Sequence, residues 1–277
     1  MKKDIKICGV QLEPKACDID HNIQKGVEWI AKCADEYSAD LAVFPETFTT
    51  GFTTGLSSKE LNNLVDEIPG KTTRDIVKAA KKYNTHVIWT TYEKAPDDKV
   101  YNSAVLITNT GEIKGVYRKI HPFPTETEWT SPGAKIEVYD TEIGKIGMMI
   151  CFDGDFAELA RIMGIKGVEI IARPAAFLRS FDTWELTNRA RAYDARAYLV
   201  GVNTVGIDNG DIYYYGHSMI ISPQGQRIAQ ALCREEIVYA KPDPEILKYA
   251  SYGNSVPFVS NNIELRRPEA YKDILDK

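Results

Sequence analysis

Two apolar periodicities alternate along the chain, and each predicts a different kind of element. Apolar residues recur at every second position from Ile5 to Leu12, which predicts a strand. From Asp20 to Glu36 they recur at three- and four-residue spacing, which predicts a helix capped by Asp18 or Asp20. The next segment, "ADLAVFPE", predicts a short buried strand that ends at its proline.

The same criteria apply to the rest of the sequence. They predict helices at residues 58–68, 73–84, 156–166, 182–196 and 244–250. They predict strands at residues 86–93, 100–108, 113–119, 135–140, 145–151, 168–174, 197–203, 217–223, 226–231 and 235–241. Alternation of strands with helices, without a Ser- or Gly-rich linker, indicates an α/β fold of two or more layers. We interpret residues 1–277 as one domain, with a tail at about 252–277 that either packs on a neighbouring subunit or is disordered.

Composition narrows the function class only by exclusion. Apolar residues make up 44% and charged residues 26% of the 277 positions, as in ordinary globular proteins. The net charge of −5 includes no basic block, so a nucleic-acid partner is not indicated. No apolar stretch reaches the roughly 20 residues that cross a bilayer, and "MKKDIKICGVQL" does not resemble a signal peptide. We therefore expect a cytoplasmic protein.

Neither the cysteines nor the histidines are spaced as metal ligands. The cysteines are odd in number, scattered, and without a CxxC motif: Cys8, Cys17, Cys33, Cys151 and Cys233. The four histidines are equally dispersed. We expect no disulfide framework and no metal site.

Three predicted strands end at a residue that can do chemistry. Glu46 follows "LAVFP", Lys119 follows "IKGVYR" and Cys151 follows "GKIGMMI". Loops just beyond strand ends are where sites collect in α/β folds. Taken singly, each residue has a simpler interpretation that we favour: Glu46 as a solvated loop charge, Lys119 as a surface lysine and Cys151 as buried filler.

The acidic residues after Cys151 pose a problem that the other two strand ends solve. Asp153 and Asp155 would raise the pKa of the thiol and weaken it as a nucleophile. A carboxylate in a dry pocket can take the thiol proton, and a lysine can stabilise the oxyanion that forms. Glu46, Lys119 and Cys151 would together suffice for catalysis without a histidine.

Segments around these three residues resemble the nitrilase superfamily, the carbon–nitrogen hydrolases. They are "VFPETFTTGF", "YRKIHPFPTE" and "GKIGMMICFDGDFAELAR", in this order, and the resemblance extends from about Ile5 to Asp243. Three ordered motifs are far more specific than one short pattern. The resemblance implies a four-layer αββα sandwich that forms a homodimer or a higher oligomer through its helices, and no metal or organic cofactor.

The resemblance also implies roles for individual residues. Cys151 would attack the carbon of a C–N bond and form a thioester, with Glu46 as general base. Lys119 and the backbone N–H of Phe152 would stabilise the oxyanion. A second glutamate after the lysine matches Glu126. In an extended segment Glu128 would face the same way, so periodicity alone does not choose between the two.

The substrate is less well defined than the reaction class. We expect a small linear amide that releases ammonia, with an N-carbamoyl amine or acid and then a nitrile as alternatives. Arg173, Phe177 and Arg179 are candidate substrate contacts, although salt-bridging arginines are the simpler interpretation. A catalytically dead scaffold of this fold and a papain-like enzyme pairing Cys151 with His217 are two further alternatives. The first does not explain why the triad is intact, and the second leaves the order of the three motifs unexplained.

Overall fold

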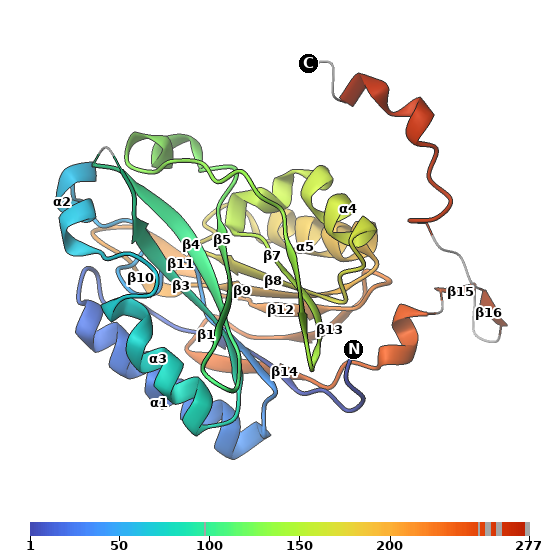
Figure 1. Cartoon of the computed structure of the whole chain (residues 1–277), viewed down its shortest axis with the longest axis horizontal. Coiled ribbons are helices and arrows are strands. Elements are labelled where there is room, and N and C mark those ends of the chain that lie inside the picture. Colours follow the sequence, from blue (N-terminus) through green and yellow to red (C-terminus); the bar gives the residue numbers. More distant parts are fainter. Residues whose placement is uncertain (97, 249, 253–255, 259–261, 275–277) are drawn as a thin grey trace.

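The computed structural model consists of two six-stranded sheets packed face to face, with helices on both outer faces (Figure 1). It describes residues 1–96, 98–248, 250–252, 256–258 and 262–274. This architecture is the expected αββα sandwich. Whether all 277 residues form one domain stays a prediction.

The first sheet has the order β14-β1-β2-β3-β4-β5. Its strands are β14 (Glu236–Ala240), β1 (Ile7–Gln11), β2 (Leu41–Val43), β3 (His86–Lys94), β4 (Val100–Ile107) and β5 (Ile113–Arg118). The strands β1, β2 and β3 are parallel, and the pairs β3–β4 and β4–β5 are antiparallel. It follows that β5 runs in the same direction as β2, so the carboxyl ends of both strands lie at the same end of the sheet.

The second sheet has the order β13-β12-β9-β8-β7-β6. Its strands are β13 (Arg227–Gln230), β12 (Met219–Ile221), β9 (Tyr198–Asn203), β8 (Ile170–Ala175), β7 (Gly144–Met148) and β6 (Val138–Thr141). The centre, β7–β8–β9, is parallel, and the outer pairs are antiparallel. The segments that follow the parallel strands β7 and β8 therefore leave this sheet at the same end.

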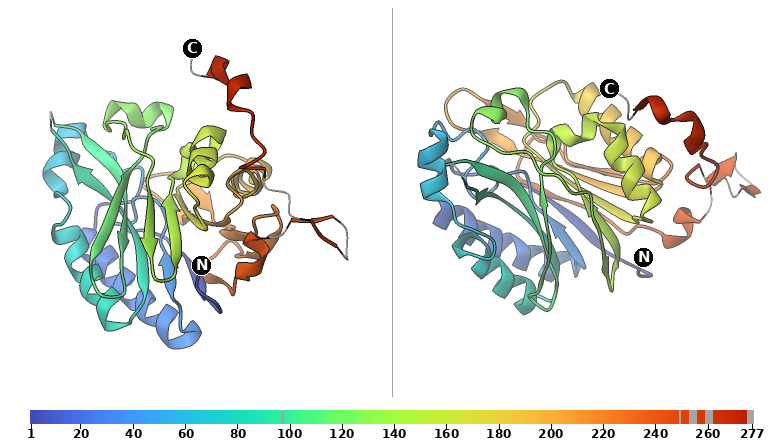
Figure 2. Two further views of the ribbon diagram at one scale, coloured as in Figure 1. Left: turned by 45° about the vertical axis from the view of Figure 1, so that its right-hand side comes forward. Right: turned by 45° about the horizontal axis from the view of Figure 1, so that its top comes forward.

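Four main helices form the outer layers. The first sheet is covered by α1 (Ile19–Tyr37) and α3 (Lys71–Lys82), and the second by α4 (Ala157–Ile165) and α5 (Phe181–Ala195) (Figure 2). Smaller elements are α2 (Ser58–Leu64) and the short strands β10 (Val205–Ile207), β11 (Tyr213–Tyr215), β15 (Ala250–Tyr252) and β16 (Val256–Phe258). Within the described ranges the 3-10 helices are η1 (Pro124–Glu128), η2 (Cys151–Asp155), η3 (Pro244–Leu247), η4 (Pro268–Ala270) and η5 (Lys272–Ile274).

Side chains on the two faces of the first sheet contribute to two different hydrophobic cores, one between the sheets and one beneath α1 and α3. In β3, Ile88 lies in the core between the sheets, whereas Val87 and Trp89 pack beneath α1 and α3. In β4, Leu106 faces the inter-sheet core and Val105 faces the helices. Since both faces of the sheet are covered, these strands are apolar at consecutive positions.

Most predicted elements are present, with shifted ends. Asp18 caps α1 by accepting a hydrogen bond from the backbone N–H of His21, as one of the two alternatives predicted. Helix α3 begins two residues before the expected Thr73, because its first turn is closed by a Gly70–Thr73 capping interaction. The strand expected to reach Cys151 ends at Met148. The hairpin of β10 and β11 was not predicted.

The tail expected at 252–277 falls partly outside the described residues. Within the described part, residues 250–252 and 256–258 form the antiparallel pair β15–β16. The described residues beyond η3 lie outside the two sheets (Figure 1), and Asn262 Nδ2 donates to the backbone carbonyl of Tyr193 on α5 at 3.5 Å. Across the described ranges, no helix is long and apolar enough to span a membrane.

Candidate active site

The ammonium of Lys119 lies between two carboxylates at the end of the first sheet. Its Nζ atom is 2.7 Å from Oε1 of Glu46 and 2.6 Å from Oε2 of Glu126. All three side chains are buried. Glu46 follows β2 and Lys119 follows β5, so the shared strand direction brings them together.

Asn102, on β4, holds both carboxylates in place. Its Nδ2 atom donates to Oε1 of Glu46 at 2.7 Å and to Oε1 of Glu126 at 2.8 Å. The backbone N–H of Ala176, just after β8, donates to Oε2 of Glu46 at 2.7 Å. Glu46 therefore accepts hydrogen bonds from residues at the ends of both sheets.

The structure separates Glu126 from Glu128. The segment forms the 3-10 helix η1 and is not extended, so residues two apart face different directions. Glu126 is buried and accepts a further hydrogen bond from the backbone N–H of Phe123 at 2.9 Å, whereas Glu128 is exposed. The sequence interpretation of an extended segment was therefore wrong, although the residue it favoured is the one beside Lys119.

Cys151 opens the 3-10 helix η2 in an uncommon backbone conformation. Its φ angle is +44°, in the left-handed region that residues other than glycine rarely occupy. Such conformations cost of order 1–3 kcal/mol and cluster at functional sites. The N–H of Phe152 lies in the first turn of η2, where backbone donors lack acceptors within the helix. The turn can therefore present a thiol and a backbone donor together.

Both acids that follow Cys151 are engaged elsewhere. The carboxylate of Asp153 accepts hydrogen bonds from Tyr117 Oη at 2.7 Å and from the backbone N–H groups of Ile150 and His121 at 3.0 and 2.9 Å. The Asp155 carboxylate binds both terminal nitrogens of Arg179 at 2.6 and 2.8 Å. Asp153 thus ties the Lys119 loop to the Cys151 loop, and neither acid is placed as a base.

Arg173 does not fit the expectation of a substrate contact. Its side chain is fully buried, and Nε and Nη2 both donate to the backbone carbonyl of Cys151, at 3.1 and 2.7 Å. Nη1 donates to Thr187 Oγ1 and Asn188 Oδ1 at 2.9 and 2.8 Å. A Cβ on Gly154 would lie 2.1 Å from the guanidinium carbon, so the glycine makes room for this arginine. Arg173 therefore stabilises the Cys151 turn through the backbone carbonyl of Cys151.

Burial and charge set the protonation of the cluster. Burial lowers the pKa of Lys119, but the charges of Glu126 and Glu46 outweigh it and raise that pKa above its ordinary value. Burial, then the charge of Glu46, raises the pKa of Cys151, against the opposing effects of Lys119 and Arg173. The resting cysteine is therefore a neutral thiol, and it needs a base to react.

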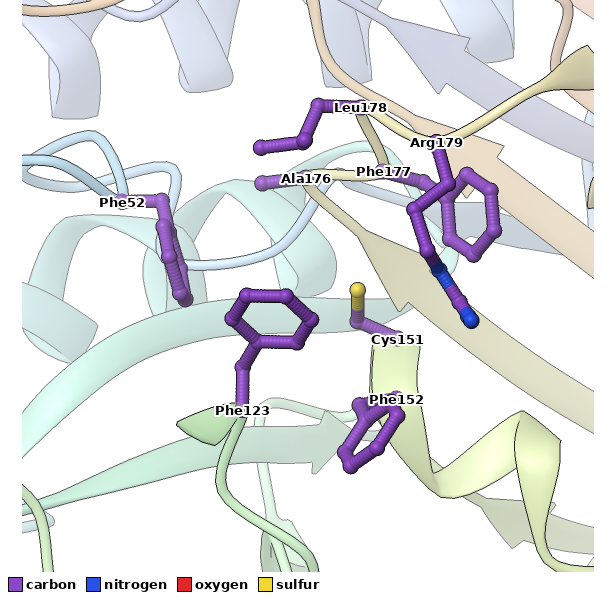
Figure 3. Close-up of a pocket in the computed structure, with 8 residues that line it drawn as sticks. All are labelled: Phe52, Phe123, Cys151, Phe152, Ala176, Phe177, Leu178 and Arg179. Carbon is purple, nitrogen blue, oxygen red and sulfur yellow. The ribbon is translucent and has the colours of Figure 1, made fainter. Parts of the chain in front are cut away.

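The thiol faces a small pocket. Figure 3 shows the sulfur of Cys151 directed into it, with Phe52 and Phe123 on one side and Phe177 and Arg179 on the other. The complete lining is Phe52, Phe123, Cys151, Phe152, Ala176, Phe177, Leu178 and Arg179. Two of the three expected substrate contacts, Phe177 and Arg179, thus line the pocket.

Residues 6–249 match the carbon–nitrogen hydrolase family. The chain belongs to this family, and it is an enzyme of the nitrilase superfamily.

Similar proteins carry different activity names. The chain is 29% identical to omega-amidase NIT3 of Saccharomyces cerevisiae, over 99% of this chain and 97% of that protein. It is 34% identical to a nitrilase of Pyrococcus abyssi, over 84% of this chain and 87% of that one. The crystal structure of Saccharomyces cerevisiae Nit3, from branch 10 of the superfamily, superposes with a TM-score of 0.81 at 31% identity, covering 89% and 93% of the two chains. Amide C–N hydrolysis is the activity that these relatives support.

The alternative of a papain-like enzyme that pairs Cys151 with His217 finds no support in the geometry. His217 Nδ1 lies 2.9 Å from Gln230 Nε2, and its ring packs on Phe181. Among the described residues, no group of three or more His, Cys, Asp and Glu side chains is arranged to hold a metal ion.

The sequence interpretation missed Asn102, Phe52, Phe123 and Leu178. The sequence did contain an indication of Asn102, because an amide inside the apolar strand "VYNSAVLIT" needs buried hydrogen-bond partners. The other three lie in loops or short elements, where periodicity says nothing about direction.

Proposed function

We propose that this enzyme hydrolyses the terminal amide of a small linear substrate through a thioester on Cys151. The observation that carries the proposal is the buried Glu46–Lys119–Glu126 cluster beside a thiol on a strained turn. The carboxylate of Glu46 lies close enough to Cys151 for its charge to raise the pKa of the thiol, as expected for the base that takes the thiol proton.

In the first half-reaction the Cys151 sulfur bonds to the amide carbon while Glu46 takes the thiol proton. The carbonyl oxygen becomes an oxyanion, which Lys119 Nζ and the N–H of Phe152 stabilise. Glu46 then passes its proton to the leaving nitrogen. The C–N bond breaks, ammonia departs, and the acyl group remains on Cys151 as a thioester.

In the second half-reaction water attacks the thioester carbon and Glu46 takes a proton from it. The same donors stabilise the second oxyanion. The C–S bond breaks, the acid leaves, and Glu46 returns its proton to the sulfur. Glu126 fixes Lys119 from the other side and helps to position the substrate or the water.

A substrate screen tests this proposal. Purified enzyme is offered matched linear amides, N-carbamoyl compounds and nitriles, with ammonia as the readout and carbon dioxide as the marker of a carbamoyl substrate. We expect kcat/KM to be highest for amides, without any dependence on chelators, since the proposed mechanism uses neither a metal nor an organic cofactor. Faster hydrolysis of a carbamoyl compound or a nitrile would contradict the substrate assignment.

We also propose that two copies pair through the outer faces of α4 and α5. Large apolar side chains stand exposed on α5, with Leu186 66% and Tyr193 58% accessible. Exposed apolar groups of this kind mark interaction surfaces when they lie on one face. Light scattering should show at least a dimer, and a stable, fully active monomer would refute this part of the proposal.

A further inference from the structure

The acyl side of the pocket combines apolar walls with a single cation. Among the eight described residues that line it, Arg179 alone carries a charge. Four phenylalanines, together with Ala176 and Leu178, form most of the remaining surface. Figure 3 shows the guanidinium of Arg179 close to Cys151, on the side of the pocket opposite Phe52. A substrate held at the sulfur would therefore extend along apolar side chains and past this one arginine.

The charge of Arg179 is already compensated. Its Nη1 and Nη2 atoms donate to the two carboxylate oxygens of Asp155, at 2.8 and 2.6 Å. The guanidinium carbon lies 4.6 Å from the ring centre of Phe177 and 5.6 Å from that of Phe152. Two aromatic contacts and a bidentate ion pair hold the side chain in one position.

A carboxylate on the substrate would meet an arginine whose charge Asp155 already balances. The fork of Nη atoms that recognises carboxylates is filled by Asp155. An incoming anion would have to displace Asp155 or lie beside its negative charge. Arg173, which unlike Arg179 is fully buried, is turned toward the Cys151 carbonyl and does not line the pocket.

A neutral apolar group meets no such obstacle. Each methylene that leaves water for an apolar wall improves binding by about fourfold, provided that it fits. The pocket is small, so its apolar surface favours a short chain.

We infer that the pocket selects amides with a neutral, apolar acyl group, and that Asp155 sets this preference by occupying Arg179. This inference rests on the proposed amidase function and assigns its substrate class. Asp155 is a specificity-determining residue that acts through Arg179.

Two substrates of equal length test the preference. Succinamate and 4-methylpentanamide differ only in carrying a carboxylate or an isopropyl group at the far end. For the unmodified enzyme we expect kcat/KM to favour 4-methylpentanamide by at least about 10-fold. Equal values, or a preference for succinamate, would overturn the inference without any variant.

Asp155→Asn tests the cause. It keeps the size of the side chain and leaves the charge of Arg179 uncompensated, so the ratio of the two kcat/KM values should fall at least about 10-fold. Adding Arg179→Met to Asp155→Asn should restore the ratio, since both charges are then absent. Asp182→Asn removes an exposed acid nearby on α5 and should leave the ratio unchanged. A ratio that does not respond to Asp155→Asn would overturn the role given to Asp155.

The failures can be told apart. Hydrolysis of other amides but of neither test compound would overturn the inference alone. No ammonia from any amide would overturn the proposed function and this inference with it.

Discussion

The two sheets end in opposite kinds of electrostatic environment. At the end of the first sheet, the Lys119 ammonium is shared between the carboxylates of Glu46 and Glu126, and every charge has a partner. At the end of the second sheet, the Arg173 guanidinium donates only to neutral acceptors, a carbonyl, a hydroxyl and an amide. Burial without a direct anionic partner lowers the pKa of Arg173 to about 10.

We infer from this difference that the two sheets contribute different groups to catalysis. The first sheet holds groups that move a proton and stabilise an oxyanion, and their mutual pairing fixes their positions. The second sheet holds the nucleophile, and the excess positive charge behind Cys151 favours any negative charge that develops on its sulfur. Changes to the charged cluster on the first sheet should therefore lower the rate more than changes to the residues that support Cys151 on the second sheet.

The largest effect among these variants is expected for Glu46→Gln, which replaces the basic carboxylate by an amide of the same shape. We expect kcat to fall at least about 10³-fold, because general base catalysis contributes about 10²–10⁴ and acts here in both half-reactions. Slow alkylation of Cys151 should continue in this variant, because loss of the Glu46 charge removes one cause of the raised pKa of its thiol. Glu93→Gln is the matched control, since Glu93 is also buried and paired, to Arg118 at 2.6 Å, but lies outside the site.

A smaller effect is expected when Lys119 loses its second partner. Glu126→Gln should slow turnover about 10²-fold while Cys151 still reacts with an electrophile, since the nucleophile and its base remain. Glu128→Gln changes an exposed side chain in the same 3-10 helix and should stay within a few-fold of the parent. Equal, near-parental rates for both would remove Glu126 from the mechanism.

A change on the second sheet should be milder still. Arg173→Met removes both hydrogen bonds to the Cys151 carbonyl and the charge behind the sulfur, and we expect kcat to fall about 10-fold with little change in KM. Arg173→Lys should recover part of the rate, because it retains the charge. Arg161→Met, on α4, is the control for loss of a partly buried arginine. A change confined to KM would show that Arg173 acts on substrate binding.

The smallest effects are expected at the other cysteines. The single alanine variants of Cys8, Cys17, Cys33 and Cys233 should keep activity within a few-fold of the parent. Cys8 and Cys33 are buried in the core beneath α1, so their loss should lower the melting temperature without lowering kcat. Loss of turnover in any of the four would place a second essential thiol in the enzyme.

Strand ends were the part of the site that the sequence could predict. The apolar pattern places a strand before each of Glu46, Lys119 and Cys151, and the resemblance to the nitrilase superfamily then singles out these three residues. The apolar pattern predicted only an α/β fold of two or more layers, and the four-layer sandwich was implied by the resemblance to the nitrilase superfamily.

The remaining features depend on geometry that periodicity does not encode. Glu126 is separated from Glu128 by the 3-10 turn of η1, which apolar spacing does not predict. Arg173 resembles a substrate-binding arginine in sequence, and only the fold shows that its partner is a backbone carbonyl. The ion pair of Asp155 with Arg179 joins residues 24 positions apart in two different loops.

The central claim, a thioester on Cys151, can be tested by intact-protein mass spectrometry during turnover. Enzyme is mixed with a good amide substrate, quenched in acid within the first turnovers, and digested to locate any adduct. The account predicts a mass increase equal to the acyl group on the peptide that contains Cys151, and neither adduct nor turnover in Cys151→Ala. Full turnover by enzyme whose Cys151 has been quantitatively alkylated would contradict it.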